Sequence, residues 1–229
     1  MNRPRSLIKC PSCGYLKARE TLISGNTIGA RFYSDGRCDA PMFPDTPIYV
    51  KCSTCDAYYK VDKTVINGQS EDFTTTLSFV EFMSIEDYVK AINIGLHNAK
   101  AKGSKEWEND QLSLRLLLWR AFNERGRKDG TQLRGNDNAD VDATKVYEDN
   151  CLEILDHLRK SSNDEDYLIR AEIHRNLSQF DLCKEMLKRI ENHGIFGRYI
   201  TFINAACDVG NTLTVSLDNE FDKLDSDFW

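Results

Sequence analysis

Two pairs of cysteines in this sequence have the spacing of metal ligands. They are Cys10 with Cys13 and Cys52 with Cys55, each pair forming a Cys-x-x-Cys motif. Such a turn brings two thiolates to the same side of a metal ion, and zinc binds four thiolates at ~2.3 Å. Gly14 follows the first pair and suits the positive φ that these turns commonly need. We therefore predict that the four cysteines hold one structural zinc ion, with rubredoxin-like iron as the alternative metal.

Two other interpretations of the cysteines are weaker. A redox dithiol would need only one Cys-x-x-Cys pair, and burial as ordinary core residues does not explain the paired spacing. The chain between the pairs contains the hairpin-type turn signals Gly25–Asn26 and Asp35–Gly36, so we expect a β-hairpin that closes the ribbon. Cys38 lies in the same insert as an unpaired fifth thiol, which we predict to be a bystander, although it is able to replace one ligand.

The set of motifs resembles uncharacterised bacterial zinc-ribbon proteins. The residues that carry the resemblance are Cys-Pro-x-Cys-Gly at 10–14, Ser-Gly-Asn-Thr-x-Gly-Ala at 24–30, Ser-Asp-Gly at 34–36, Ala-Pro-Met at 40–42 and the second Cys-x-x-Cys. They span about residues 8–60. Asp56 departs from the pattern, because a second knuckle usually carries glycine there. The resemblance implies a zinc ribbon and brings no known activity with it.

Charge and proline content divide the chain into a basic first part and an acidic second part. Residues 1–65 hold ten Lys or Arg and six Asp or Glu, a net charge of +4, and the remaining residues carry −10. All five prolines precede residue 48, which leaves the later chain free to be helical. We expect a zinc-ribbon domain at 1–66, a linker or extra strand at 67–83, a helical domain at 84–210 and an acidic tail at 211–229.

The elements expected to position these residues are a small β-ribbon and a series of amphipathic helices. Ser84-Ile-Glu-Asp87 reads as a capping box, followed by helical spacing up to Ala99. Further helices are expected at 105–125, 143–160, 165–178, 180–192 and 195–208, and the last is apolar enough to pack inside the others. The pair at 165–192 resembles a tetratricopeptide repeat. The predicted fold class is α+β: a small N-terminal β zinc ribbon followed by an all-α, helical-hairpin (TPR-like) domain.

Two further groups of residues are candidates for binding. Arg115, Trp119 and Asn123 follow one another at intervals of four residues, so they share one helix face that could hold a partner's carboxylate, phosphate or peptide terminus. The alternative is a solvated face with an arginine lying over a tryptophan. Basic residues interleaved with aromatic ones in the ribbon suggest a nucleic-acid surface; the ones singled out are Lys17, Arg19, Arg31 and Arg37.

The function expected from these features is a protein-interaction module or adaptor, with a protein partner or self-association. Nucleic-acid binding or regulation through the basic ribbon is the alternative, although the helical part at −10 would repel a phosphate backbone. The sequence has no HExxH motif or nucleophile elbow, so no catalysis is indicated and no small-molecule substrate is identified. Lacking a signal peptide or a membrane-length apolar run, the chain is expected to be cytoplasmic.

Overall fold

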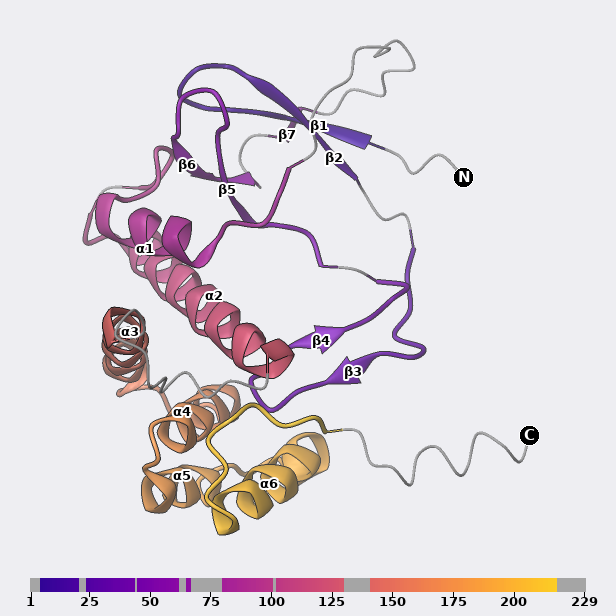
Figure 1. Cartoon of the computed structure of the whole chain (residues 1–229), viewed down its shortest axis with the longest axis vertical. Helices are drawn as coiled ribbons and strands as arrows, with labels where there is room; N and C mark the ends of the chain where they lie inside the picture. The colour runs from indigo at the N-terminus through magenta and orange to yellow at the C-terminus, as the bar shows by residue number, and fades with distance from the viewer. Residues whose placement is uncertain are drawn as a thin grey trace. The chain divides into compact units, whose positions relative to one another are not determined.

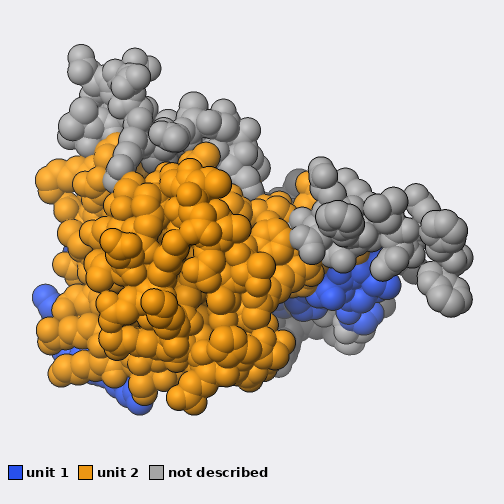
Figure 2. All heavy atoms as spheres, turned by 90° about the horizontal axis from the view of Figure 1, so that it is seen from below, with its two compact units in different colours: residues 1–28, 40–118 blue, residues 29–39, 119–229 orange. Residues whose placement is uncertain are grey.

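The computed structural model describes residues 5–20, 24–43, 45–61, 65–66, 80–100, 102–129 and 141–217. Within them, small antiparallel β-hairpins occupy the N-terminal half and helices occupy the C-terminal part, so the fold is α+β (Figure 1). The chain forms two compact units, residues 1–28 with 40–118 and residues 29–39 with 119–229, which Figure 2 colours separately.

The first unit contains two β-hairpins, each with one Cys-x-x-Cys motif at its tip. Its strands are β1 (Arg5–Lys9), β2 (Leu16–Glu20), β5 (Tyr49–Lys51), β6 (Tyr58–Lys60) and β7 (Val65–Ile66). Strand β1 pairs antiparallel with β2 and with β7, while β5 pairs antiparallel with β6. In this way the pairing of β1 with β2, and of β5 with β6, fixes the two ends of each cysteine turn.

The hairpins share a small apolar core to which the cysteines themselves contribute. Its buried members are Ile8, Val50, Tyr59 and Val61 together with Cys10 and Cys52. Side chains alternate across a strand, so Ile8 and Val50 point into this core while their neighbours Lys9 and Lys51 remain more exposed. Two of the six buried side chains are candidate metal ligands, so the candidate site and the core of this unit share residues.

Helix α1 (Ile85–Ile94) begins as predicted and ends earlier than predicted. The Ser84 hydroxyl accepts a hydrogen bond from the Asp87 amide, and the Asp87 side chain accepts one from the Ser84 amide, which confirms the capping box. The helix was expected to continue to Ala99, but it ends before Gly95, whose φ of 86° lies in a region that glycine adopts without strain. Asp87 also accepts a hydrogen bond from Tyr58 Oη at 3.0 Å, which joins α1 to β6.

Helix α2 (Lys105–Asp129) contributes to both units, because the division falls between Leu118 and Trp119. Its first part holds Asp110, a buried carboxylate that accepts hydrogen bonds from Tyr49 Oη at 3.1 Å and Lys60 Nζ at 2.8 Å. These two bonds tie the helix to β5 and β6. The second cysteine hairpin therefore rests on helical residues as well as on its own core.

The second unit consists of helices and one short hairpin. The helices after α2 are α3 (Val141–Leu158), α4 (Asp164–Asn176), α5 (Phe180–Leu187) and α6 (His193–Asp208), and the hairpin strands are β3 (Arg31–Phe32) and β4 (Cys38–Asp39). Helices α4, α5 and α6 share a core that includes Leu168, Leu187 and Ile203. The turn from α4 to α5 contains Ser178 at a φ of 62°.

Two expectations about these elements are corrected by the structure. Helix α6 is not packed inside the others: only Ile203, Ala206 and Cys207 are buried on it, because its first turns face solvent. The hairpin of the insert does form, as β3 paired with β4, but it belongs to the helical unit rather than to the cysteine hairpins. Its hydrogen bonds to α2, α4 and residues 211–217, given below, explain this placement.

Some predicted features lie wholly or partly outside the described residues. These are the linker expected at 67–83, of which residues 80–83 are described, and the acidic tail expected at 211–229, of which residues 211–217 are described. No helix in the described part of the chain is both long and apolar enough to cross a membrane.

Candidate metal centre

The two cysteine turns have the same backbone hydrogen-bond pattern. In the first, the Cys10 amide donates to Tyr15 O at 2.8 Å and the Gly14 amide donates to Cys10 O at 2.9 Å. In the second, the Cys52 amide donates to Ala57 O at 2.9 Å and the Asp56 amide donates to Cys52 O at 3.0 Å. The fifth residue of each turn has a positive φ, 77° at Gly14 and 56° at Asp56. Asp56 therefore occupies the backbone position that glycine occupies in the first turn.

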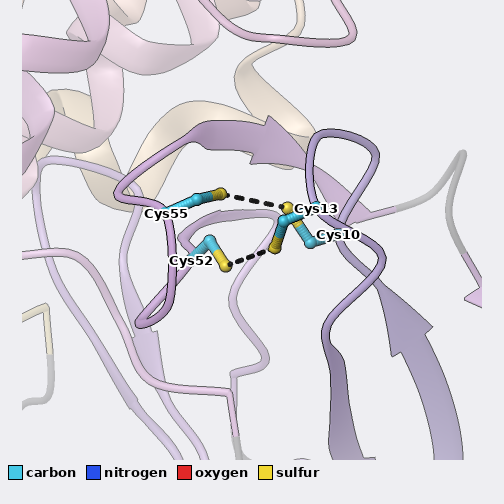
Figure 3. A group of neighbouring side chains, drawn as sticks. All are labelled: Cys10, Cys13, Cys52 and Cys55. Atoms are coloured by element: carbon cyan, nitrogen blue, oxygen red, sulfur yellow. Dashed lines mark hydrogen bonds between the residues drawn. The ribbon is translucent and has the colours of Figure 1, made fainter.

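The four sulfur atoms lie together between the hairpin tips (Figure 3). Cys10 Sγ lies 3.8 Å from Cys55 Sγ, and Cys13 Sγ lies 3.6 Å from Cys52 Sγ. All four sulfurs are within 4.8 Å of one another. Tetrahedral coordination at ~2.3 Å separates its sulfur ligands by about 3.8 Å. The cluster therefore has the dimensions of a four-thiolate metal site, and these residues could hold a metal ion.

Backbone amides surround the sulfurs as they would surround thiolates. The Thr54 amide donates to Cys52 Sγ at 3.4 Å. Amides of Ser12 and Cys13 donate to Cys10, the Tyr15 amide donates to Cys13, and the Ala57 amide donates to Cys55. Each sulfur thus receives at least one N–H, an arrangement that stabilises negative charge on sulfur.

Because the four thiols lie close together, their pKa values differ from one another. The Ala57 amide and hydrogen bonds from neighbouring groups lower the pKa of Cys55 to about 7. Against the lowering effect of the Tyr15 amide, burial and hydrogen bonds with the other three thiols raise the pKa of Cys13 to about 12. One thiolate forms readily, and further ionisation is opposed by the charge already present. A bound cation removes this opposition, because metal ligation requires every thiol to lose its proton.

Cys38 does not join this cluster. It lies in β4, half-buried and paired in register with Phe32, and it belongs to the helical unit. Cys10 and Cys52 are buried at the base of the cluster, while Cys13 and Cys55 are exposed. The ligand set predicted from spacing is therefore the set that the structure brings together, and Cys38 serves as a comparison thiol.

The helix-face residues Arg115, Trp119 and Asn123 lie on α2 but do not present a common exposed surface. Trp119 and Asn123 are buried. Trp119 Nε1 donates to Asn176 Oδ1 at 3.0 Å, and Asn123 accepts from Tyr147 Oη at 3.2 Å. Only Arg115 is partly exposed. Trp119 and Asn123 each have a hydrogen-bond partner inside the unit. A binding partner could therefore not reach them unless the unit opened.

The basic residues proposed for nucleic-acid binding divide between the two units. Lys17 and Arg19 belong to the first unit, and Arg31 and Arg37 belong to the second. Lys17 is 7% exposed, and Arg19 Nη2 donates to Thr46 Oγ1 at 2.5 Å. Arg37 forms ion pairs of 2.8 Å with Asp39 and with Glu124. Arg31 is exposed. Of the four, therefore, Arg31 is the side chain most available to a phosphate.

A cluster of buried polar side chains in the second unit was not predicted. We call Ser34, Glu172 and Arg175 the Ser34 cluster; all three are buried, and the last two are completely inaccessible to solvent. Ser34 Oγ donates to Glu172 Oε1 at 2.5 Å, and Arg175 forms a bidentate ion pair with the same carboxylate. Arg175 Nη1 also donates to the Asn211 carbonyl at 2.5 Å. The cluster therefore joins the β3–β4 hairpin to α4 and to the chain after α6.

The turn beside Ser34 adds a second buried carboxylate, that of Asp35. Asp35 accepts hydrogen bonds from the Arg37 amide at 3.1 Å and from Asn123 Nδ2 at 3.2 Å. Burial raises the pKa of Asp35 above its ordinary range. Backbone bonds complete the attachment: Ser34 donates to Val215 O at 3.0 Å, and Leu217 donates to Phe32 O at 2.8 Å. Residues more than 130 positions apart meet here, and the only signal in the sequence was a Ser-Asp-Gly turn.

No family model, curated protein or solved structure matches this chain.

Proposed function

We propose that Cys10, Cys13, Cys52 and Cys55 bind one structural zinc ion, and that the chain is a zinc-stabilised protein-interaction module. The observation that carries the zinc assignment is the set of four sulfurs at tetrahedral spacing, each with an amide donor. Four thiolates favour zinc or iron over the harder cations. A closed set of four protein ligands leaves no position for a substrate, so the ion would act by holding the two hairpins together.

Exposed apolar side chains in the first unit support the interaction role. Met42 and Phe43 are consecutive and expose 58% and 52% of their surface. They lie against residue 25, where a Cβ would overlap the Phe43 ring and approach Met42 O to 2.8 Å. Glycine at this position therefore permits close packing beneath two side chains that remain open to solvent. Neighbouring exposed apolar groups commonly mark protein-binding surfaces.

Zinc binding is tested by comparing two single variants of the full chain. Cys13→Ser removes one of the four sulfurs, and Cys38→Ser removes a thiol outside the cluster. We expect one zinc per chain in the wild type and in Cys38→Ser, measured by metal analysis after purification without added metal. Cys13→Ser should bind zinc more than about 100-fold more weakly, beyond the loss expected from removing a supporting contact alone. Equal zinc content in all three proteins would reject the ligand assignment, and iron in place of zinc would correct the metal.

The interaction role is tested at Met42 and Phe43. We expect the double variant Met42→Ser/Phe43→Ser to lose self-association, measured by sedimentation, or binding of a protein captured reproducibly by the wild type. Leu152→Ser is a matched control, because Leu152 is a similarly exposed apolar residue on α3. Equal loss in the control, or no change in the double variant, would reject this surface. An oligonucleotide affinity that falls steeply with salt and weakens in Arg31→Glu would instead favour nucleic-acid binding.

A further inference from the structure

A second group of neighbouring thiols lies in the helical unit, apart from the metal site. Cys183 on α5 and Cys207 on α6 have their sulfur atoms 3.4 Å apart. Both belong to the core shared by α4, α5 and α6, where Leu187 and Ile203 surround them. Both are free thiols in this structure. The two sulfurs are in direct contact although 23 residues separate them in the chain.

The distance between these sulfurs is close to what a disulfide needs. A disulfide requires a separation of about 2.05 Å, so the sulfurs would move together by about 1.4 Å. Cys183 lies on α5 and Cys207 lies on α6, and these two helices pack against each other. This feature distinguishes the pair from two core cysteines that merely share a cluster.

The surroundings assign different roles to the two thiols. Cys183 is fully buried, while Cys207 retains 6% of its exposure and lies in the last turn of α6. Burial raises the pKa of Cys207, but the hydrogen bond that it shares with Cys183 and the charges of Arg175 and Lys184 oppose this effect. Lys184 itself pairs with Asp208 at 2.6 Å. Cys207 is therefore the thiol that a small oxidant would reach first and the one more readily ionised.

We propose that Cys183 and Cys207 are an oxidation site that forms a reversible disulfide between α5 and α6 in response to a hydroperoxide. The Cys207 thiolate attacks one peroxide oxygen, the O–O bond breaks, and Cys207 becomes a sulfenic acid as water or an alcohol leaves. Cys183 then attacks the Cys207 sulfur, loses its proton and displaces a second water. The two thiols are oxidised by two electrons, which reduce one peroxide.

Cys151 is a third buried cysteine of the helical unit and differs from this pair. Cys151 on α3 is fully buried, and burial raises its pKa to about 12. The structure gives it a hydrogen bond with the Tyr147 side chain rather than with a second thiol. Cys151 is therefore a matched control: a core cysteine of the same unit that should resist oxidation under the same conditions.

The experiment is a disulfide map of the full, zinc-loaded chain after treatment with hydrogen peroxide. Reduced protein is freed of reductant, oxidised in steps, blocked by alkylation and digested with trypsin. Cleavage after Arg175, Lys184, Arg198 and Lys223 places Cys183 in residues 176–184 and Cys207 in residues 199–223. We expect a cross-linked pair of these two peptides, which dithiothreitol separates again. Its formation should precede zinc release, which distinguishes it from oxidation of the four metal-binding thiols.

Two variants complete the test. Cys207→Ala should abolish the cross-linked peptide, and Cys151→Ala should leave its yield and rate unchanged. Helical circular dichroism verifies that each variant folds, and the wild-type map decides the question by itself if Cys207→Ala does not. Two results would overturn the proposal: Cys183 and Cys207 that remain reduced when zinc is released, or their oxidation to sulfinic acid with no cross-link. A failure here would leave the zinc assignment untouched, because the two sites share no residue.

Discussion

At the scale of single residues, two backbone positions control the shape of the cysteine turns. Gly14 and Asp56 occupy equivalent places in the two turns, and both have a positive φ. An L-residue with a side chain pays about 1–2 kcal/mol for this conformation. Asp56 accepts that strain, and its ion pair with Lys51 at 3.3 Å compensates little because the Asp56 side chain is 81% exposed.

Substituting these two positions should have opposite effects. We expect Gly14→Ala to lower the free energy of unfolding of the first unit by about 1–2 kcal/mol, through strain alone, since the nearest atom to the new Cβ is Lys9 Cε at 3.5 Å. Asp56→Gly should be neutral or raise stability by up to about 1 kcal/mol. Urea unfolding of the zinc-loaded protein measures both changes. Equal destabilisation by the two variants would show that the turns are not equivalent.

The buried carboxylate of Asp35 should produce a pH dependence of stability. Its pKa in the folded protein is raised above the ordinary value of 3.8, mainly by burial. Between 3.8 and the raised value, the folded protein retains a proton that the unfolded chain has lost, so stability falls as the pH rises through this interval. Asp35→Asn cannot ionise and should show a flatter profile. Unfolding measured at a series of pH values checks this, and identical slopes in the two proteins would contradict it.

At the scale of elements, the Ser34 cluster fastens the β3–β4 hairpin to the helical unit. Ser34 Oγ donates to Glu172 and accepts from the Val215 amide at 3.0 Å, so one hydroxyl joins three segments of the chain. Buried polar groups that lose a partner cost about 1–3 kcal/mol each. The hairpin is therefore held by a few polar contacts that depend on one another.

Ser34→Ala should weaken this attachment. We expect a loss of about 1–3 kcal/mol in unfolding free energy, because Glu172 and the Val215 amide each lose a buried partner. Hydrogen exchange at the Val215 and Leu217 amides should accelerate together. Thr201→Ala is the control, since exposed Thr201 bonds only to Gly197 O in its own helix and should change stability by less than about 0.5 kcal/mol. Equal effects in the two variants would mean that the cluster does not fasten the hairpin.

Local sequence patterns predicted where helices form better than they predicted which segments contact one another. Ser84 and Asp87 signal a helix start by their spacing alone, and the structure contains that capping box. The end of α1 at Ile94 was missed, because an apolar pattern continued past Gly95 while the backbone of that glycine did not remain helical. Helix α6 was expected inside the bundle, since its composition is apolar, yet composition does not tell which face has a neighbour.

The same distinction applies to the candidate sites. The four cysteines were identified because each Cys-x-x-Cys motif defines its own turn, so only the meeting of two turns had to be inferred. Glu172 and Ser34 lie 138 positions apart, and nothing in either local sequence indicates the other. Trp119 and Asn123 share a helix face as predicted from their spacing, but both are buried, with Trp119 donating to Asn176 on α4 and Asn123 accepting from Tyr147 on α3.

At the scale of the whole molecule, the two units should respond differently to metal removal. The core of the cysteine hairpins includes Cys10 and Cys52, whereas the core of α4, α5 and α6 contains no residue of the metal site. We expect a chelator to accelerate hydrogen exchange at the Gly14 and Asp56 amides and to leave the buried α4 and α5 amides protected. Simultaneous loss of protection in both cores would contradict this and would show one cooperative unit.

Metal affinity should also depend strongly on pH. The pKa of Cys13 is raised to about 12, so zinc must displace its proton at neutral pH. We expect the affinity to decrease as the solution becomes more acidic, by about tenfold per pH unit for each proton released on binding. Competition with a chelator of known affinity, at pH values from about 6 to about 8, measures how steeply the zinc affinity changes with pH. An affinity independent of pH would exclude thiol ligands.

The zinc proposal requires that four cysteine sulfurs surround one ion between the two hairpins. X-ray absorption at the zinc edge of the full chain tests it most directly, because it reports the number and type of ligand atoms. We expect about four sulfur neighbours at ~2.3 Å and no nitrogen or oxygen bound directly to the zinc. A shell containing nitrogen or oxygen ligands, or purified protein with no zinc edge at all, would contradict it.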